Sequence, residues 1–267
     1  MCWWCRERPA TTGEHKFKAT DLRRLMGCSD ELIWGDDSAQ QSIRGKKGIK
    51  RDRYGVIKFH KSLCAPCNNE RSQSFDRAYD DFATFIASKR PRSAAGISLE
   101  GIYGASWPED SLNLARYYVK HFGCRFVRNG IPVPSAMRAF LNGADDMPDV
   151  HLGLVTVDEV HVSPYSKGLS MSQDIVINDV DDNRIKGYAM AAYIGPVGVR
   201  FEWNVKLLQD EPPSQFFHFP RPVINTFKTQ DDMFRGITRR HGRWARFTQW
   251  VQAPSSEDLK EYRRSLG

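Results

Sequence analysis

The sequence predicts an α+β protein with a cysteine-stapled N-terminal unit, a helical segment and a small antiparallel β-rich accessory region. Three observations support this fold class. Two Cys-x-x-Cys pairs lie near the start, apolar residues at helical spacing follow the second pair, and the apolar period changes to two near residue 150. We expect units over residues 1–90, 91–147 and 148–225, followed by a basic helical tail over 226–267.

Within the first unit, the elements follow from local patterns. Trp3-Trp4 between the first cysteines indicates a tight knuckle with one apolar side. Phe75, Tyr79, Phe82 and Ile86 form one apolar stripe of a helix. The expected elements are a short helix capped by Thr20 or Asp21 and ended by Gly27, an exposed loop over 35–53, a strand over 54–63 and a helix over 68–88.

The remaining chain predicts two helices and then a sheet. Residues 91–110 are expected to be a connection, and helices are expected over 111–123 and 134–141. Two alternating runs, 188–194 and 197–205, flank Gly195-Pro196 and predict a hairpin. The alternating residues are Tyr188, Met190, Ala192 and Ile194, then Val197, Val199, Phe201, Trp203 and Val205.

The composition indicates a folded chain without a membrane span. Of the 267 residues, 40% are hydrophobic and 12% aromatic, which is enough for a buried core. No apolar run approaches the ~20 residues that cross a bilayer, and the charged N-terminus does not resemble a signal peptide. The default expectation is a cytoplasmic protein with no membrane partner, in which the six cysteines do not form a disulfide framework.

The net charge of +7 is distributed unevenly along the chain. Residues 1–90 have a balance of +6, residues 91–220 a balance of −4, and residues 221–267 a balance of +5. A basic unit suits a polyanionic partner such as nucleic acid. Ordinary solvated surface charge accounts for the same numbers equally well.

The two cysteine pairs predict a structural zinc site. Each Cys-x-x-Cys turn directs two thiolates to one ion, so Cys2, Cys5, Cys64 and Cys67 complete a tetrahedral shell. A redox pair is the alternative, but such a pair normally opens a helix after a thioredoxin-like strand. A closed four-thiolate shell has no open position, so the chemistry has to come from other residues.

Three residues near the cysteines have side chains suited to that chemistry. Glu14 and His15 place a carboxylate beside an imidazole, and Asn68 opens the long helix directly after the last cysteine. The side-chain oxygen of Asn68 is a hard ligand that suits Mg²⁺. Asp76 and Asp80, one helical turn apart, are expected to be surface acids.

The order CxxC…Glu-His…Leu-Cys-x-x-Cys-Asn-x-x-Arg resembles the HNH endonucleases of the ββα-metal, or His-Me finger, type over roughly residues 2–75. The resemblance implies a β-hairpin and a helix around one catalytic divalent ion, Mg²⁺ or Mn²⁺. It assigns the general base to His15, the metal ligands to Glu14 and Asn68, and a phosphate contact to Arg71. The reaction implied is hydrolysis of phosphodiester bonds, with DNA as the expected substrate.

The chain departs from the family pattern at one functional position. The family's middle asparagine, which orients the histidine, falls on Phe59, with His60 beside it. Either His60 takes that catalytic support role or another part of the chain supplies it. The loop between Glu14-His15 and the second cysteine pair is also long, with an insertion near 27–53.

Basic residues near these motifs are candidates for nucleic-acid contact. The loop candidates lie within ten residues and would follow a phosphate backbone, although an exposed solvated loop has the same composition. The full set of candidates is Arg71, Lys16, Lys46, Lys47, Lys50 and Arg51.

Three functional hypotheses remain open from the sequence, the third being a redox protein built on the cysteine pairs. The first is an HNH endonuclease whose residues 91–267 serve dimerisation, target recognition or contact with a regulatory protein. Analogy alone suggests a role as a restriction or anti-phage effector in antiviral defence. The second is a non-catalytic zinc-knuckle module that binds nucleic acid or protein with a degenerate Glu14-His15 pair.

Overall fold

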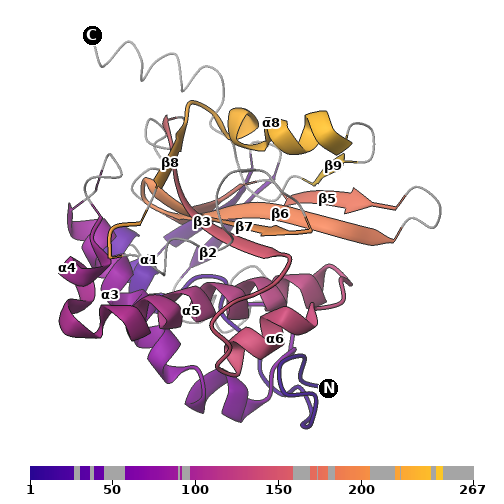
Figure 1. The fold of residues 1–267 in the computed structure, drawn as a ribbon, viewed down its shortest axis with the longest axis horizontal. Coiled ribbons are helices and arrows are strands. Elements are labelled where there is room, and N and C mark those ends of the chain that lie inside the picture. The colour runs from indigo at the N-terminus through magenta and orange to yellow at the C-terminus, as the bar shows by residue number, and fades with distance from the viewer. Residues whose placement is uncertain are drawn as a thin grey trace.

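A layer of helices packs against one face of a seven-stranded sheet in the computed structural model (Figure 1). The structure describes residues 1–26, 31–36, 39–44, 58–89, 91, 97–158, 169–172, 174–179, 184–204, 220–222, 224–241 and 245–248. The helices are α1 (Ala19–Met26), η1 (Pro66–Glu70), α3 (Gln73–Lys89), α4 (Leu99–Tyr103), η3 (Gly104–Ser106), α5 (Trp107–Arg128), α6 (Ser135–Leu141) and α8 (Gln230–His241). The strands are β1 (Glu31–Asp36), β2 (Ala39–Arg44), β3 (Val150–Val157), β4 (Leu169–Met171), β5 (Asp174–Asn178), β6 (Ile185–Ile194), β7 (Val197–Trp203), β8 (Ile224–Phe227) and β9 (Ala245–Thr248). The α+β class predicted from the sequence is confirmed.

The sheet is built around the predicted hairpin. Its strand order is β8-β3-β7-β6-β5-β9, and β4 also pairs with β6. Strands β6 and β7 are antiparallel, with Ile194 opposite Val197, so Gly195 and Pro196 form the turn. Gly195 has a φ of 53°, a conformation that favours glycine and suits a two-residue turn.

The two faces of the sheet belong to two hydrophobic clusters. The predicted alternating set, with Tyr188, Met190 and Phe201, faces α5, where Phe122 stacks on Phe201 at 4.4 Å between ring centroids. The opposite face packs against α8 through Met233 (Figure 1). The α5 cluster also includes the cysteine knuckles and α3, so the N-terminal residues and the sheet share one core.

Helix α5 lies between the N-terminal knuckle and the sheet. Most of its length is buried, and Gly123 allows the indole ring of Trp3 to lie directly against the helix backbone. A Cβ at position 123 would approach the ring carbons of Trp3 more closely than van der Waals radii allow. The glycine therefore serves the docking of the first knuckle onto α5.

We expect Gly123→Ala to destabilise the protein by roughly 1–3 kcal/mol, because overpacking against Trp3 outweighs the gain in helix propensity, about 1 kcal/mol. Urea denaturation of the protein measures this change. Combination with Trp3→Leu should recover part of the loss, since the smaller side chain opens space. An unchanged or higher stability of Gly123→Ala alone would contradict the role assigned to the glycine.

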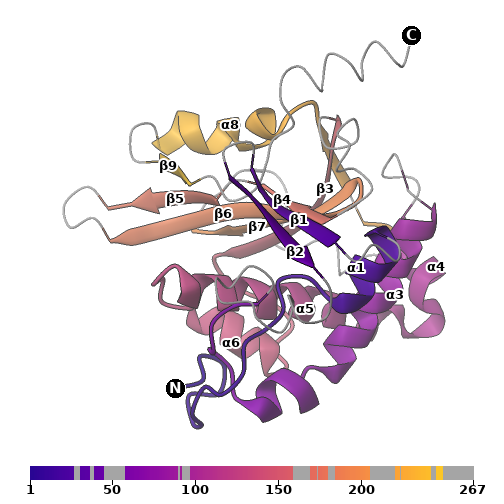
Figure 2. The ribbon, with the colours of Figure 1, turned by 180° about the vertical axis from the view of Figure 1, so that it is seen from behind.

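Several sequence predictions differ from the structure. In the strand expected over 54–63, the described residues 58–63 form only isolated bridges at Lys58 and Leu63, and Thr20 and Asp21 lie inside α1 rather than at its cap. Part of the expected loop over 35–53 is strand, because β1 and β2 pair antiparallel from Glu31 and Arg44 to Asp36 and Ala39 (Figure 2). The expected connection over 91–110 contains α4 and η3, and α5 begins within it, at Trp107. The expected helical tail contains α8, but also the strands β8 and β9, which pair with β3 and β5. Among the described residues, no helix is long and apolar enough to span a bilayer.

Candidate metal centre and adjoining cavity

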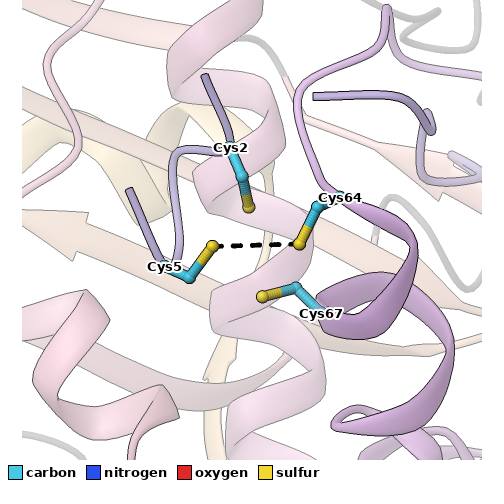
Figure 3. Close-up of side chains that lie close together, drawn as sticks. All are labelled: Cys2, Cys5, Cys64 and Cys67. Carbon is cyan, nitrogen blue, oxygen red and sulfur yellow. Dashed lines mark hydrogen bonds between the residues drawn. The ribbon is translucent and has the colours of Figure 1, made fainter. Parts of the chain in front are cut away.

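Four cysteine side chains converge from the two knuckles on one point (Figure 3). The sulfur atoms of Cys2, Cys5, Cys64 and Cys67 all lie within 4.8 Å of one another, and Cys5 Sγ lies 3.8 Å from Cys64 Sγ. Zinc–thiolate bonds of about 2.3 Å at tetrahedral angles place sulfurs about 3.8 Å apart. All four are free thiols, so the donor set and its spacing fit a tetrahedral zinc ion. The predicted metal-binding arrangement is confirmed.

Backbone hydrogen bonds in the first knuckle favour the thiolate form of Cys5. Burial opposes ionisation of Cys5, but the backbone N–H groups of Glu7 and Arg8 favour the thiolate and lower the Cys5 pKa to about 7. Burial and the neighbouring sulfur atoms raise the pKa of Cys67. A bound cation would offset the effects that raise the Cys67 pKa, because it stabilises all four thiolates together.

Arg71 lies against the metal centre rather than the adjoining cavity. Its Nη1 is 3.7 Å from Cys67 Sγ, and its Nη2 donates to Asn142 Oδ1 at 2.6 Å. Its guanidinium lies over the Trp4 ring at 4.6 Å, and Trp4 Nε1 donates to the same Asn142 oxygen. In this position Arg71 connects the two knuckles to the end of α6.

An antiparallel pairing beside the cysteines positions Glu14 and His15. Thr12 pairs with Leu63 and His15 with Lys58, and Phe59 N donates to the Glu14 carbonyl at 2.9 Å. The second segment leads through Cys64 into η1 and then α3. The segments 11–16 and 58–63, joined by these two isolated bridges, therefore precede η1 and α3 in the chain.

A cavity of about 590 Å³ lies beside this pairing, with Glu14, His15 and Asn68 in its wall. The backbone N–H of Asn68 donates to the Cys64 carbonyl at 3.0 Å, which ties this residue to the second knuckle. Asn68 Oδ1 is buried and has no hydrogen-bond partner among the described residues. A buried carbonyl oxygen without a donor is destabilising, so this atom is suited to a bound cation or ligand. The cavity is lined by Thr11, Thr12, Gly13, Glu14, His15, Lys18, Lys58, Phe59, Lys61, Asn68, Asn69 and Asp76.

The Glu14 carboxylate is buried and paired with a lysine from α5. Glu14 Oε2 lies 3.1 Å from Lys120 Nζ, and the two side chains are 8% and 1% exposed. Burial raises the Glu14 pKa, and the Lys120 ammonium opposes that rise. Lys120 also lies 3.6 Å from Asp76 Oδ1.

The environment of His15 favours a neutral imidazole. Burial lowers its pKa below the ordinary value of 6.5, and the positive charges of Lys58 and Lys120 lower it further. A neutral ring at pH 7 has an unprotonated nitrogen and is able to accept a proton.

Several predicted site residues lie away from the cavity wall. His60 is exposed and is not among the described lining residues, and Phe59 packs its ring against His121 at 5.0 Å between centroids. Lys16 is 6% exposed, with its ammonium 5.6 Å from the centroid of the Phe59 ring, so burial argues against direct phosphate contact. The predicted basic loop lies outside the described residues; its members are Lys46, Lys47, Lys50 and Arg51.

The structure adds residues that sequence analysis missed. Asp76 was expected to be a surface acid, but it lines the cavity and pairs with Lys18 at 3.3 Å. The sequence separation of Asn68 and Asp76 does not indicate that both line the cavity, because the two residues do not lie on one regular helix. The π-helix η1 and a turn precede α3. Lys58 and Lys61 are exposed cavity residues whose positions follow from the antiparallel pairing. No local sequence pattern indicates that Lys120 reaches the site, since its position depends on how α5 packs.

Searches of known protein families, curated proteins and solved structures found no match to this chain.

Proposed function

We propose that this protein is a metal-dependent endonuclease of the HNH type that hydrolyses phosphodiester bonds in DNA. The observation that supports it best is the shared cavity of Glu14, His15 and Asn68, in which Asn68 Oδ1 is buried without a hydrogen-bond partner among the described residues. These residue types are the ones that the HNH resemblance assigns to metal binding and proton transfer. The four-cysteine centre stabilises the segments that bring them together.

Each residue has a defined role in this proposal. Glu14 and Asn68 hold a divalent ion, which when bound supplies Lewis-acid stabilisation of the phosphate and the leaving oxygen. His15 accepts the proton of the attacking water, and its lowered pKa keeps it in the required neutral form. The antiparallel pairing at His15 and Lys58 restrains the backbone from which the imidazole projects.

Charge at the cavity favours an anionic substrate. Lys18, Lys58 and Lys61 outnumber the two lining carboxylates, Glu14 and Asp76. Lys58 and Lys61 are exposed, so we assign the phosphate contacts to these two lysines. Arg71, which the family pattern places on phosphate, contacts Cys67 and Asn142 instead.

Cleavage of supercoiled plasmid DNA tests the proposal. We expect the zinc-loaded protein to nick the plasmid when Mg²⁺ or Mn²⁺ is added, and not when the divalent ion is omitted. Omission is preferable to a chelator, because a chelator would also remove the structural zinc. Folded, zinc-loaded protein that does not cleave DNA with either ion would contradict the proposal.

The protonation of His15 provides a test that is independent of turnover. Burial, Lys58 and Lys120 all disfavour the charged ring, so His15 should stay neutral as the pH falls through 6.5 and become protonated only below it. An NMR titration of the histidine ring signals, with His15→Ala to assign the signal, measures this midpoint. A midpoint at or above 6.5 would contradict the environment described for His15.

The second candidate function is a non-catalytic zinc-knuckle module that binds nucleic acid or protein. One observation favours it: the family's orienting asparagine is replaced by Phe59, whose ring is buried against His121. His60 is not among the described residues that line the cavity, so it does not replace the orienting asparagine. Binding of DNA without cleavage, unaffected by His15→Ala, is the result that would favour this candidate.

A further inference from the structure

Lys120 reaches the candidate site from α5, a helix that follows the cavity-lining residues in the chain. It lies in the middle of α5 and is 1% exposed, yet its ammonium group contacts side-chain oxygens of Glu14, Ser72 and Asp76. Nζ is 3.1 Å from Glu14 Oε2 and donates to Ser72 Oγ at 3.2 Å. A buried ammonium ion is stable only when it is paired and hydrogen-bonded, and these contacts meet that requirement.

These contacts link both proposed ligands of the divalent ion. Glu14 contacts Lys120 directly while also lining the cavity. The Ser72 hydroxyl, which accepts from Lys120, donates to the Asn68 carbonyl oxygen at 2.8 Å. One ammonium group therefore connects the Glu14 carboxylate to the backbone of Asn68 in η1.

We propose that Lys120 is a positioning residue, which fixes Glu14 and Asn68 in the cavity wall and thereby sets the affinity of the site for a divalent cation. This inference rests on the proposed function, because it uses Glu14 and Asn68 as the ligands. Groups that orient metal ligands typically change metal affinity by about 10–100-fold when they are removed.

Electrostatics alone predicts the opposite effect of Lys120. A positive charge beside Glu14 repels an incoming cation, so its removal would strengthen binding if Glu14 kept its position. Glu14, however, is 8% exposed, and loss of its partner leaves a buried carboxylate with an uncompensated charge. A buried carboxylate without its partner leaves its position, so loss of the ligand geometry is the larger effect.

Binding of Mn²⁺ to the full-length, zinc-loaded protein, measured by calorimetry or electron paramagnetic resonance, tests the inference. We expect Lys120→Met to weaken Mn²⁺ binding by about 10–100-fold and Lys120→Arg to retain most of the affinity. The loss caused by Lys120→Met should be much smaller in the Glu14→Gln background, since the contact with Glu14 is already lost there and only the link through Ser72 to Asn68 remains. Lys89→Met, which removes an exposed lysine at the end of α3 that is not among the described cavity-lining residues, is the control and should change affinity by less than about 3-fold.

Zinc content and circular dichroism identify variants that fail to fold. If Lys120→Met loses its zinc, Ser72→Ala becomes the test, because it cuts the link to Asn68 and leaves the Lys120–Glu14 pair in place. We expect this variant to bind Mn²⁺ several-fold more weakly. The inference alone is overturned if folded Lys120→Met binds Mn²⁺ as tightly as wild type or more tightly. Where Ser72→Ala is used instead, unchanged Mn²⁺ binding has the same consequence. A wild-type protein that binds no Mn²⁺ overturns the proposed function as well.

Discussion

Replacement of Cys64 by alanine is expected to abolish zinc binding and unfold the N-terminal part of the protein. Cys64 is 2% exposed, and its sulfur belongs to a cluster in which all four sulfurs lie within 4.8 Å of one another. Structural zinc contributes about 10–16 kcal/mol in small zinc-binding peptides, which is comparable to the whole stability of a typical domain, about 5–15 kcal/mol. The zinc content of the purified variant and its thermal unfolding measure the effect.

Cys124 offers a matched control for this experiment. It is also a buried cysteine, 1% exposed, but its sulfur accepts a hydrogen bond from Ser62 and lies outside the four-cysteine cluster. Cys124→Ala should therefore keep one zinc per chain and lose only about 1–2 kcal/mol of stability. A soluble Cys64→Ala protein with wild-type stability would show that the cluster has no structural role.

Replacement of His15 by alanine is expected to lower the rate of DNA cleavage by about 10²–10⁴-fold at neutral pH, the usual contribution of a general base. Zinc content should not change, because His15 is not part of the cysteine cluster. Binding of Mn²⁺ should also remain, since Glu14 and Asn68 are retained. The measurement is the initial rate of plasmid nicking with Mn²⁺ at a fixed, saturating DNA concentration.

His60→Ala is the control for the loss of a histidine on the same pairing. His60 is exposed and is not among the described cavity-lining residues, so we expect its replacement to change the rate by less than about 3-fold. A large loss with His60→Ala would restore it as the residue that orients His15. Equal rates for His15→Ala and wild type would exclude His15 as the general base.

Local patterns predicted the elements that depend on neighbouring residues. The stripe with Phe75, Tyr79 and Phe82 predicted α3, and these side chains are buried in the main core. The alternating residues of β6 and β7 predicted the hairpin, and Tyr188, Met190 and Phe201 among them lie in the main core. Both patterns follow directly from the 3.6-residue and two-residue periods of the backbone.

Elements that depend on distant partners were missed. Strand β9 (Ala245–Thr248) is short and joins the sheet by pairing with β5, a contact that no local pattern in a basic segment indicates. Strand β2 (Ala39–Arg44) is largely polar, so composition alone favours a loop. In both cases pairing with another strand, rather than propensity, sets the backbone conformation.

By itself, the sequence determined the four-cysteine ligand set and the proximity of Glu14 and His15, because both follow from spacing along the chain. Only the tertiary structure decided which charged residues share the cavity. Packing of α5 against the knuckles and α3 brings Lys120 into contact with Glu14 and Asp76. The path of the chain through η1 and α3 places Asp76 in the cavity wall, whereas Arg71 contacts Cys67. These positions depend on how whole helices pack, and a side chain's neighbours in the sequence do not encode that.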